Sequence, residues 1–219
     1  MAIADRMTYL KPVIREMQKL WPDNRTVNIV FHGHSVPSGY FVTPEVRTFS
    51  AYPHLLHTDL KEIYPFAVIN AIVTAISGEK CREGAKRFKD TVLCHLPDVL
   101  TIDYGLNDRC LDIQTAENAW RYMIEEALAK DVKVLLLTPS WDFSYYSKNE
   151  EWEKLQAKAE QIRRLASEYS IGLADSFQAY GEYVEAGGDL WDLLSQGNHP
   201  NRKGHAIIAK ELLKWFRPF

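Results

Sequence analysis

Side chains that could carry out nucleophilic chemistry occur in four short segments of the chain. Ser35 follows a glycine and a histidine, and its hydroxyl could attack an electrophilic carbon. His199 precedes a proline, which holds its backbone extended, so its imidazole could serve as a general base. Between them, the backbone N–H of Gly78 and the side-chain amide of Asn107 could donate hydrogen bonds to a developing oxyanion. One such donor lowers a barrier by roughly 2.7–4 kcal/mol.

Each segment also has an ordinary structural interpretation. Ser35 could cap a helix, and Gly105–Asp108 consists of residues that favour turns. His199 could be an exposed loop residue, whereas His205, one turn inside the last helix, is expected to be structural. Whether these segments have a chemical or a structural role therefore depends on where the helices and strands place them.

Apolar segments alternate with amphipathic ones along the chain. β-branched and aromatic residues mark buried strands, and helical spacing of apolar residues marks the segments around them. This alternation predicts a three-layer α/β/α sandwich with a five-stranded parallel sheet. The expected strands span 27–31, 67–76, 99–102, 132–137 and 171–174, and the expected helices span 9–20, 79–93, 116–128, 152–169 and 202–216.

The chemically active segments all follow an expected strand or precede the last helix. Ligands of open α/β sheets bind beyond the carboxyl ends of the strands, so these segments should meet there. The longest irregular stretches, 33–47 and 140–148, also follow strands. No repeat or linker divides the chain, and we expect one domain over residues 1–219.

The motifs Gly33-His34-Ser35, Gly78, Gly105-Leu106-Asn107-Asp108 and His199-Pro200-Asn201 with Gly204-His205 resemble, in this order, those of the SGNH hydrolases, also called GDSL-type esterases and lipases. The resemblance covers residues 27–208, and its third and last motifs are the most specific. It implies an SGNH (flavodoxin-like) sandwich that hydrolyses carboxylic esters without a cofactor. Ser35 would be the nucleophile and His199 the base, and Ser35, Gly78 and Asn107 would form the oxyanion hole. The substrate class implied is an acetyl or short-acyl ester of a carbohydrate or small molecule.

Two positions depart from the family pattern. His34 stands where the family usually has aspartate, so the hydrogen bonds of that carboxylate must be replaced or lost. Gln196 stands three residues before His199, where the family places the aspartate of the triad. Replacing that carboxylate by an amide in a serine protease lowers turnover by about 10⁴.

Three hypotheses account for the missing carboxylate. Ser35 and His199 could form a dyad oriented by a neutral acceptor, either Gln196 or a backbone carbonyl. Asp192 or Asp189 could supply a displaced carboxylate, or the site could be impaired.

A metal-dependent hydrolase is an alternative interpretation. His32 and His34 lie two residues apart on an extended segment and so share a face, with Asp108 or His199 available to complete a ligand set. Few acidic residues follow the later strands, and we expect no metal.

A third alternative is a ligand-binding module without turnover. The loop Trp141–Tyr146 offers aromatic rings that could stack on sugars, line an acyl channel, form a lid or contact another subunit. The expected pocket residues are His34, Tyr40, Asp108 and Trp141, with Phe41 and Arg47 either lining the pocket or packing nearby.

The composition excludes several other classes of protein. The 219 residues carry 26 basic and 29 acidic side chains, a net charge of −3, which argues against nucleic acid as a partner. No segment is apolar enough for a membrane span or a signal peptide, so we expect a cytoplasmic protein unless a secretion signal has been removed. Cys81, Cys94 and Cys110 lack metal-binding spacing and are expected to be buried. The oligomeric state is not predicted.

Overall fold

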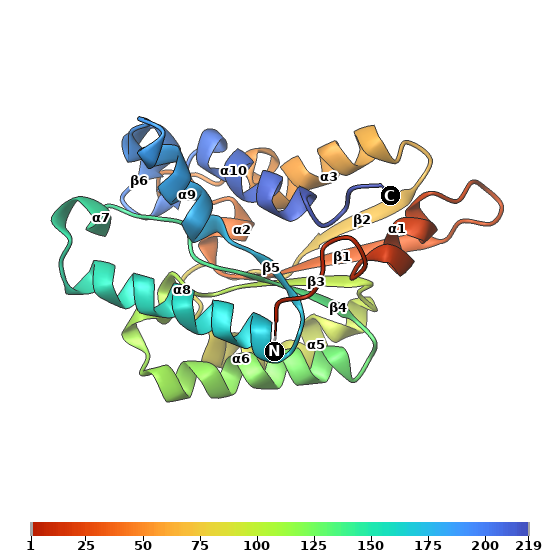
Figure 1. The fold of residues 1–219 in the computed structure, drawn as a ribbon, viewed down its shortest axis with the longest axis horizontal. Coiled ribbons are helices and arrows are strands. Elements are labelled where there is room, and N and C mark those ends of the chain that lie inside the picture. Colours follow the sequence, from red (N-terminus) through yellow and green to blue (C-terminus); the bar gives the residue numbers. More distant parts are fainter. Residues whose placement is uncertain (1, 219) are drawn as a thin grey trace.

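A parallel sheet lies between two layers of helices in the computed structural model, which describes residues 2–218 (Figure 1). The strand order is β2-β1-β3-β4-β5, and every neighbouring pair is parallel. This arrangement confirms the predicted α/β/α sandwich with a five-stranded parallel sheet. The strands are β1 (Thr26–Gly33), β2 (Val68–Val73), β3 (Val99–Asp103), β4 (Lys133–Leu137) and β5 (Gly172–Ala174).

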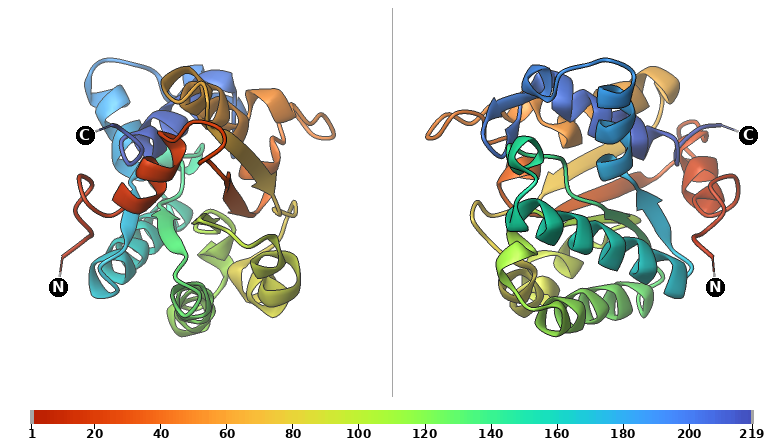
Figure 2. Two further views of the ribbon diagram at one scale, coloured as in Figure 1. Left: turned by 90° about the vertical axis from the view of Figure 1, so that its right-hand side faces the viewer. Right: turned by 60° about the vertical axis from the view of Figure 1, so that its left-hand side comes forward.

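The helices cover both faces of this sheet (Figures 1 and 2). One layer contains α1 (Lys11–Met17), α3 (Tyr52–Ile63), α9 (Ser176–Glu185) and α10 (Arg202–Leu213). The other contains α4 (Cys81–Lys86), α5 (Phe88–Thr91), α6 (Ile113–Leu128) and α8 (Glu150–Glu168). Shorter elements are the helices α2 (Ser35–Ser38) and α7 (Ser144–Ser147), the 3-10 turns η1 (Thr48–Ser50), η2 (Leu93–His95), η3 (Asn107–Cys110) and η4 (Leu190–Leu193), and the antiparallel hairpin β6 (Leu194–Gln196) and β7 (His199–Pro200).

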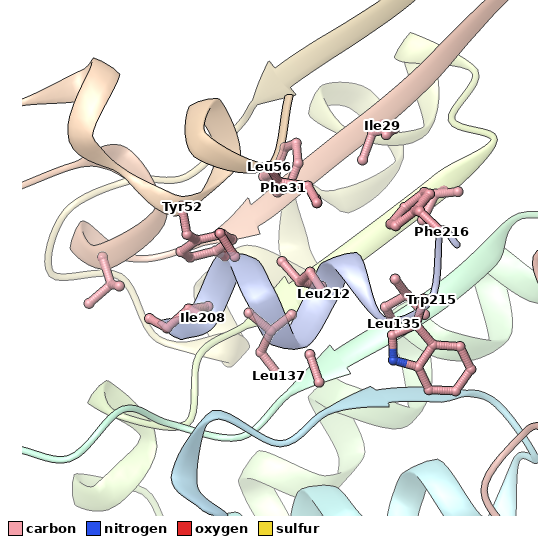
Figure 3. Packing of buried hydrophobic residues seen from close by; sticks show 14 of the residues in the cluster. Ile29, Phe31, Tyr52, Leu56, Leu135, Leu137, Ile208, Leu212, Trp215 and Phe216 are labelled. Carbon is pink, nitrogen blue, oxygen red and sulfur yellow. The ribbon is translucent and has the colours of Figure 1, made fainter. Parts of the chain in front are cut away.

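The last helix is anchored to the sheet by its apolar face (Figure 3). Ile208 and Leu212 of α10, and Trp215 just after it, are buried in a cluster with residues of β1, β4 and α3. The indole N–H of Trp215 donates to the carbonyl of Leu173 in β5 at 3.0 Å. Because α10 begins three residues after His199, this packing also holds the segment that carries His199.

Several predicted elements differ in extent from the observed ones. The first helix ends at Met17, and Leu20 is exposed rather than buried. The helix expected over 79–93 is divided into α4, α5 and η2, because Arg87 departs from helical geometry at φ −98°, ψ 2°. The second strand ends at Val73, three residues early.

The sequence analysis did not identify α3, α9 or the β6–β7 hairpin. In α3 the buried residues recur every four positions, but polar residues, including two histidines, separate them and weaken the pattern. The hairpin strands are two and three residues long, too short for any periodicity.

The cysteine prediction holds for one of three residues. Cys81 is buried, whereas Cys94 and Cys110 are exposed because they lie on the surface turns η2 and η3. None of the helices within residues 2–218 has the length and apolar character needed to cross a membrane.

Candidate active site

Ser35 begins α2 directly beyond the carboxyl end of β1. The register of the parallel sheet pairs Gly33 with Asp103. A Cβ at Gly33 would lie 2.4 Å from the Asp103 carbonyl oxygen, so only glycine allows the backbones to approach this closely. This approach sets β1 against β3 where the chain turns into α2, and Ser35 itself is buried.

His199 contacts both Ser35 and the chain just beyond α2. Its Nε2 lies 3.1 Å from Ser35 Oγ, and its Nδ1 lies 3.1 Å from the carbonyl oxygen of Phe41. A carbonyl can only accept a hydrogen bond, so Nδ1 carries the proton and Nε2 presents a lone pair. The Ser35 hydroxyl therefore donates to Nε2, as a nucleophile donates to its base.

The protonation state of His199 suits a base. Burial lowers the pKa of His199 below its ordinary value, so the ring is neutral at pH 7. The ring of Tyr40 lies beside the His199 ring, with centroids 6.1 Å apart.

The β6–β7 hairpin and α10 together hold His199. The Ser195 hydroxyl donates to the His199 carbonyl at 3.0 Å across the hairpin. Asn201 caps α10, because its Oδ1 accepts from the backbone N–H groups of Lys203 at 2.8 Å and Gly204 at 3.2 Å. His199 thus sits between a short hairpin and a capped helix.

None of the three side chains proposed to orient His199 does so. Gln196 Oε1 instead accepts from the backbone N–H of Thr43 at 2.9 Å and from its hydroxyl at 3.2 Å. Asp192 accepts from the Tyr183 hydroxyl, and Asp189 accepts from the Tyr146 hydroxyl. Of the hypotheses considered, the geometry matches a neutral backbone acceptor, supplied by Phe41.

His34, which stands where the family usually has aspartate, caps α2 and faces a buried carboxylate. Its Nδ1 accepts from the backbone N–H of Val36 at 3.2 Å, so the ring caps α2 beside Ser35. Its Nε2 faces Asp103 Oδ1 at 3.5 Å, and Asp103 Oδ2 accepts from the Tyr52 hydroxyl at 3.2 Å. His34 is therefore buried behind Ser35. It does not line the pocket, which corrects the prediction that it is a pocket residue.

Burial shifts both members of this pair toward neutrality. It raises the pKa of Asp103 to about 7 and lowers the pKa of His34 to about 3. One negative charge is thus the most that the pair carries.

The candidate oxyanion donors lie on the neighbouring loops. Ile76 N donates to the Gly33 carbonyl at 3.0 Å, and Ser38 Oγ donates to the Ala75 carbonyl at 3.1 Å, so the loop leading to Gly78 runs beside α2. Gly78 has φ +76°, which favours glycine, and shares a hollow of about 270 Å³ with Asn107. Asn107 Nδ2 donates one hydrogen to the Glu79 carbonyl at 2.9 Å, which leaves its second hydrogen for a ligand.

Two predicted pocket residues are structural instead. Asp108 is fully buried, accepting from Cys81 N at 2.9 Å and from Trp120 Nε1 at 2.8 Å. Trp141 is buried against Tyr145 and Trp152, with ring centroids 4.6 and 4.9 Å away. The prediction that Asp108 and Trp141 line the pocket is therefore wrong, because residues at the ends of strands can contact the core as well as a ligand.

The other residues considered at the sequence level have local partners. His205 is buried and its Nδ1 accepts from Tyr52 N at 3.2 Å, in keeping with a structural role. The Arg47 guanidinium lies 3.7 Å from the centroid of the Phe41 ring and forms an ion pair with Glu45. These contacts brace the loop whose Phe41 carbonyl meets His199.

The metal alternative lacks a ligand set. The ring nitrogens of His32 lie 3.1 Å from the hydroxyls of Thr74 and Tyr104, away from the partners of His34. Residues 2–218 contain no group of three His, Cys, Asp or Glu side chains placed to hold a metal ion.

Sequence reasoning missed Asp103, Tyr52 and Thr43 as parts of this site. Asp103 carried a signal, since it is an acidic residue at the end of a strand otherwise apolar or hydroxylic. The Phe41 carbonyl carried no signal in the sequence, because every residue has a backbone carbonyl.

Comparison with known proteins identifies the family of this chain. The model of the GDSL-like lipase/acylhydrolase family matches residues 31–207, and the chain belongs to this family. The protein is accordingly a hydrolase that acts on ester bonds.

Similar proteins include esterases of carbohydrates. An acetylxylan esterase from Geobacillus stearothermophilus is 24% identical over 174 residues, which cover 71% of this chain and 75% of that protein. The structure of a catalytic mutant of an acetylxylan esterase from the same organism superposes with a TM-score of 0.74 at 20% identity, covering 88% of this chain and 97% of the other.

Two further solved structures share the fold. A two-domain esterase active on acetylated mannans gives a TM-score of 0.72 at 20% identity, with 98% of this chain matching 54% of that one. A lipase/acylhydrolase from Enterococcus faecalis gives 0.73 at 22% identity, covering 86% of this chain and 94% of the other.

Proposed function

We propose that this protein is a serine esterase that removes acetyl groups from a carbohydrate, with Ser35 as nucleophile and His199 as base. The observation that carries the proposal is the position of His199 between the Phe41 carbonyl and the Ser35 hydroxyl. Family membership supports ester hydrolysis. The similarity to an acetylxylan esterase and to an esterase active on acetylated mannans supports a carbohydrate acetyl ester as the substrate.

In the first half-reaction, Ser35 Oγ attacks the acetyl carbon while His199 Nε2 takes the hydroxyl proton. The oxyanion that forms accepts hydrogen bonds from the backbone N–H groups of Ser35 and Gly78 and from the Asn107 amide. The intermediate collapses when the bond to the sugar oxygen breaks and His199 gives that oxygen its proton. Acetyl-Ser35 and the free sugar hydroxyl result.

In the second half-reaction, His199 takes a proton from water as the water oxygen attacks acetyl-Ser35. The second tetrahedral intermediate expels Ser35 Oγ, which receives the proton back from His199, and acetic acid leaves and ionises to acetate in solution. Each proton that moves within the site therefore passes through His199 Nε2.

The Phe41 carbonyl accounts for turnover without a triad carboxylate. An amide in place of the aspartate of a serine protease is damaging because it favours the wrong histidine tautomer. A backbone carbonyl cannot donate, so it holds Nδ1 protonated and keeps Nε2 free. The site forgoes only the negative charge that would stabilise the imidazolium.

A substrate screen with an active-site control tests this function. We expect p-nitrophenyl acetate to be hydrolysed faster than longer acyl esters, and acetylated xylan or mannan oligosaccharides to release acetate. Ser35→Ala should lower kcat by at least about 10³-fold, and a serine-directed phosphonate should inactivate the wild type stoichiometrically. If no ester is hydrolysed while Ser35→Ala binds ligands as the wild type does, the chain is a binding module. Loss of activity with a chelator would point to a metal enzyme.

A further inference from the structure

Two exposed aromatic side chains and one half-buried one form a surface, here called the aromatic ledge, beside the hairpin that carries His199. Phe143 and Tyr146 come from the loop after β4, and Trp191 comes from η4. Trp191 is 59% exposed and Tyr146 is 47% exposed. In Figures 1 and 2 the loop with α7 and the segment with β6 lie together at one end of the molecule.

Hydrogen bonds hold the ledge in place although the rings of Tyr146 and Trp191 are exposed. The Tyr146 hydroxyl donates to Asp189 Oδ1. The backbone nitrogen of Trp191 lies 3.1 Å from the Tyr146 hydroxyl oxygen and 3.1 Å from Asp189 Oδ1. The planes of Tyr146 and Trp191 are 31° apart with centroids separated by 6.4 Å, and Phe143 packs against Trp191 at 4.1 Å. Exposed rings fixed in this way are prepared for a ligand rather than for the core.

The ledge adjoins the hairpin that carries His199. Phe143 N–H donates to the Gly197 carbonyl at 2.9 Å, in the turn just before His199. At most about 7 Å of extended backbone separates Gly197 from His199. The rings therefore belong to segments that are attached to the one carrying the candidate base.

We propose that the aromatic ledge is a subsite for a sugar unit next to the acetylated one, so that the enzyme prefers oligosaccharides to small acetate esters. This inference rests on the proposed function. The C–H face of a sugar ring stacks on aromatic rings, and its hydroxyls need polar partners at the edge of the rings. Asp189, whose Oδ1 accepts from the Tyr146 hydroxyl and the Trp191 backbone N–H, has its Oδ2 left to accept from those hydroxyls.

The same features disfavour other occupants. The Asp189 carboxylate beside the rings would repel phosphates and would lose hydration under an acyl chain, whereas Asp192 is paired with Lys203 at 3.3 Å. A neutral sugar chain satisfies both the apolar faces and the Asp189 carboxylate.

The test compares one substrate that carries sugars with one that does not. In Trp191→Ala we expect the ratio of kcat/KM for acetylated xylo- or manno-oligosaccharide to kcat/KM for p-nitrophenyl acetate to fall roughly three- to tenfold, mainly through the KM of the oligosaccharide. Trp191→Phe should recover part of this ratio. Trp21→Ala is the matched control, because Trp21 is 85% exposed and lies outside the site.

Three results would overturn the ledge proposal. Neither kcat/KM could change, both kcat/KM values could fall by the same factor, or Trp191→Ala could alter the sedimentation mass, which would make the ledge an interface between copies. The first two outcomes leave the esterase function intact if the wild type still cleaves p-nitrophenyl acetate. If the wild type cleaves no ester, binding of xylohexaose and mannohexaose still tests the ledge. Each sugar is titrated into Ser35→Ala and into Ser35→Ala/Trp191→Ala, and only the Ser35→Ala variant should bind it.

Discussion

Two histidines flank Ser35, and they have opposite surroundings. His199 Nε2 contacts the Ser35 hydroxyl, whereas His199 Nδ1 meets only the neutral Phe41 carbonyl. His34 lies in the core behind Ser35, and its Nε2 faces the carboxylate of Asp103. The carboxylate that is missing beside the candidate base is thus found beside the other histidine.

The difference separates orientation from charge. The Phe41 carbonyl can fix the tautomer of His199 but adds no charge, so we propose that this base works by position alone. The His34–Asp103 pair holds the backbone around Ser35, with Tyr52 linking it to α3. The departures from the family pattern at positions 34 and 196 therefore have different structural consequences.

The largest effect is expected when the core pair is given two carboxylates. His34→Asp restores the family residue but buries a second acid next to Asp103, and an unpaired buried charge costs about 3–5 kcal/mol. We expect the free energy of unfolding in urea to fall by about that amount and kcat on p-nitrophenyl acetate to fall with it.

Rescue distinguishes charge from shape at this pair. His34→Asp/Asp103→Asn should recover most of the stability and activity, because only one carboxylate remains and an amide can face it. A double variant no better than His34→Asp alone would show that the two side chains are not coupled.

A smaller effect is expected at Gln196. Its contact with Thr43 steadies the loop of Phe41, so Gln196→Ala should lower kcat only about two- to tenfold, the worth of one neutral hydrogen bond. Gln196→Asp keeps an acceptor for Thr43 and should stay close to the wild type.

Results outside that range would identify a different partner for His199. A collapse of activity in Asp192→Ala or Asp189→Ala, with Gln196→Ala unaffected, would mean that one of these carboxylates moves to the base in the working enzyme.

The smallest effect concerns pH. Activity requires neutral His199 and falls as pH drops through its pKa, which burial lowers below the ordinary value of about 6.5. A plot of kcat/KM for p-nitrophenyl acetate against pH should therefore have its acid limb below pH 6.5. A limb at pH 7 or above would reveal an adjacent carboxylate, since an opposite charge raises the pKa of an imidazole.

The sequence predicted the sheet well because its signals are local. The predicted strands 99–102 and 132–137 lie within or around the observed Val99–Asp103 and Lys133–Leu137, whose apolar residues are buried, and composition alone indicated them. The helix α9 was missed, and the extents of α1 and of the α4–α5 region were misjudged, because tertiary contacts override weak periodicity there.

Sequence order also indicated which side chains belong near the site, but not which of them face a ligand. Asp108 and Trp141 lie at strand ends as expected, yet Asp108 binds Trp120 and Trp141 packs on Trp152. Residue type does not distinguish a core contact from a pocket wall when both lie at the same edge of a sheet.

The sequence by itself determined the fold class, the family and the residues available for chemistry, since these follow from apolar periodicity and from the order of motifs. Only the tertiary structure decided what orients His199. The acceptor is the backbone carbonyl of Phe41, 158 residues away in the chain, and a carbonyl leaves no trace in residue type. Its role as a partner depends on where the fold places the loop after α2, which packing and hydrogen bonds across the whole molecule decide.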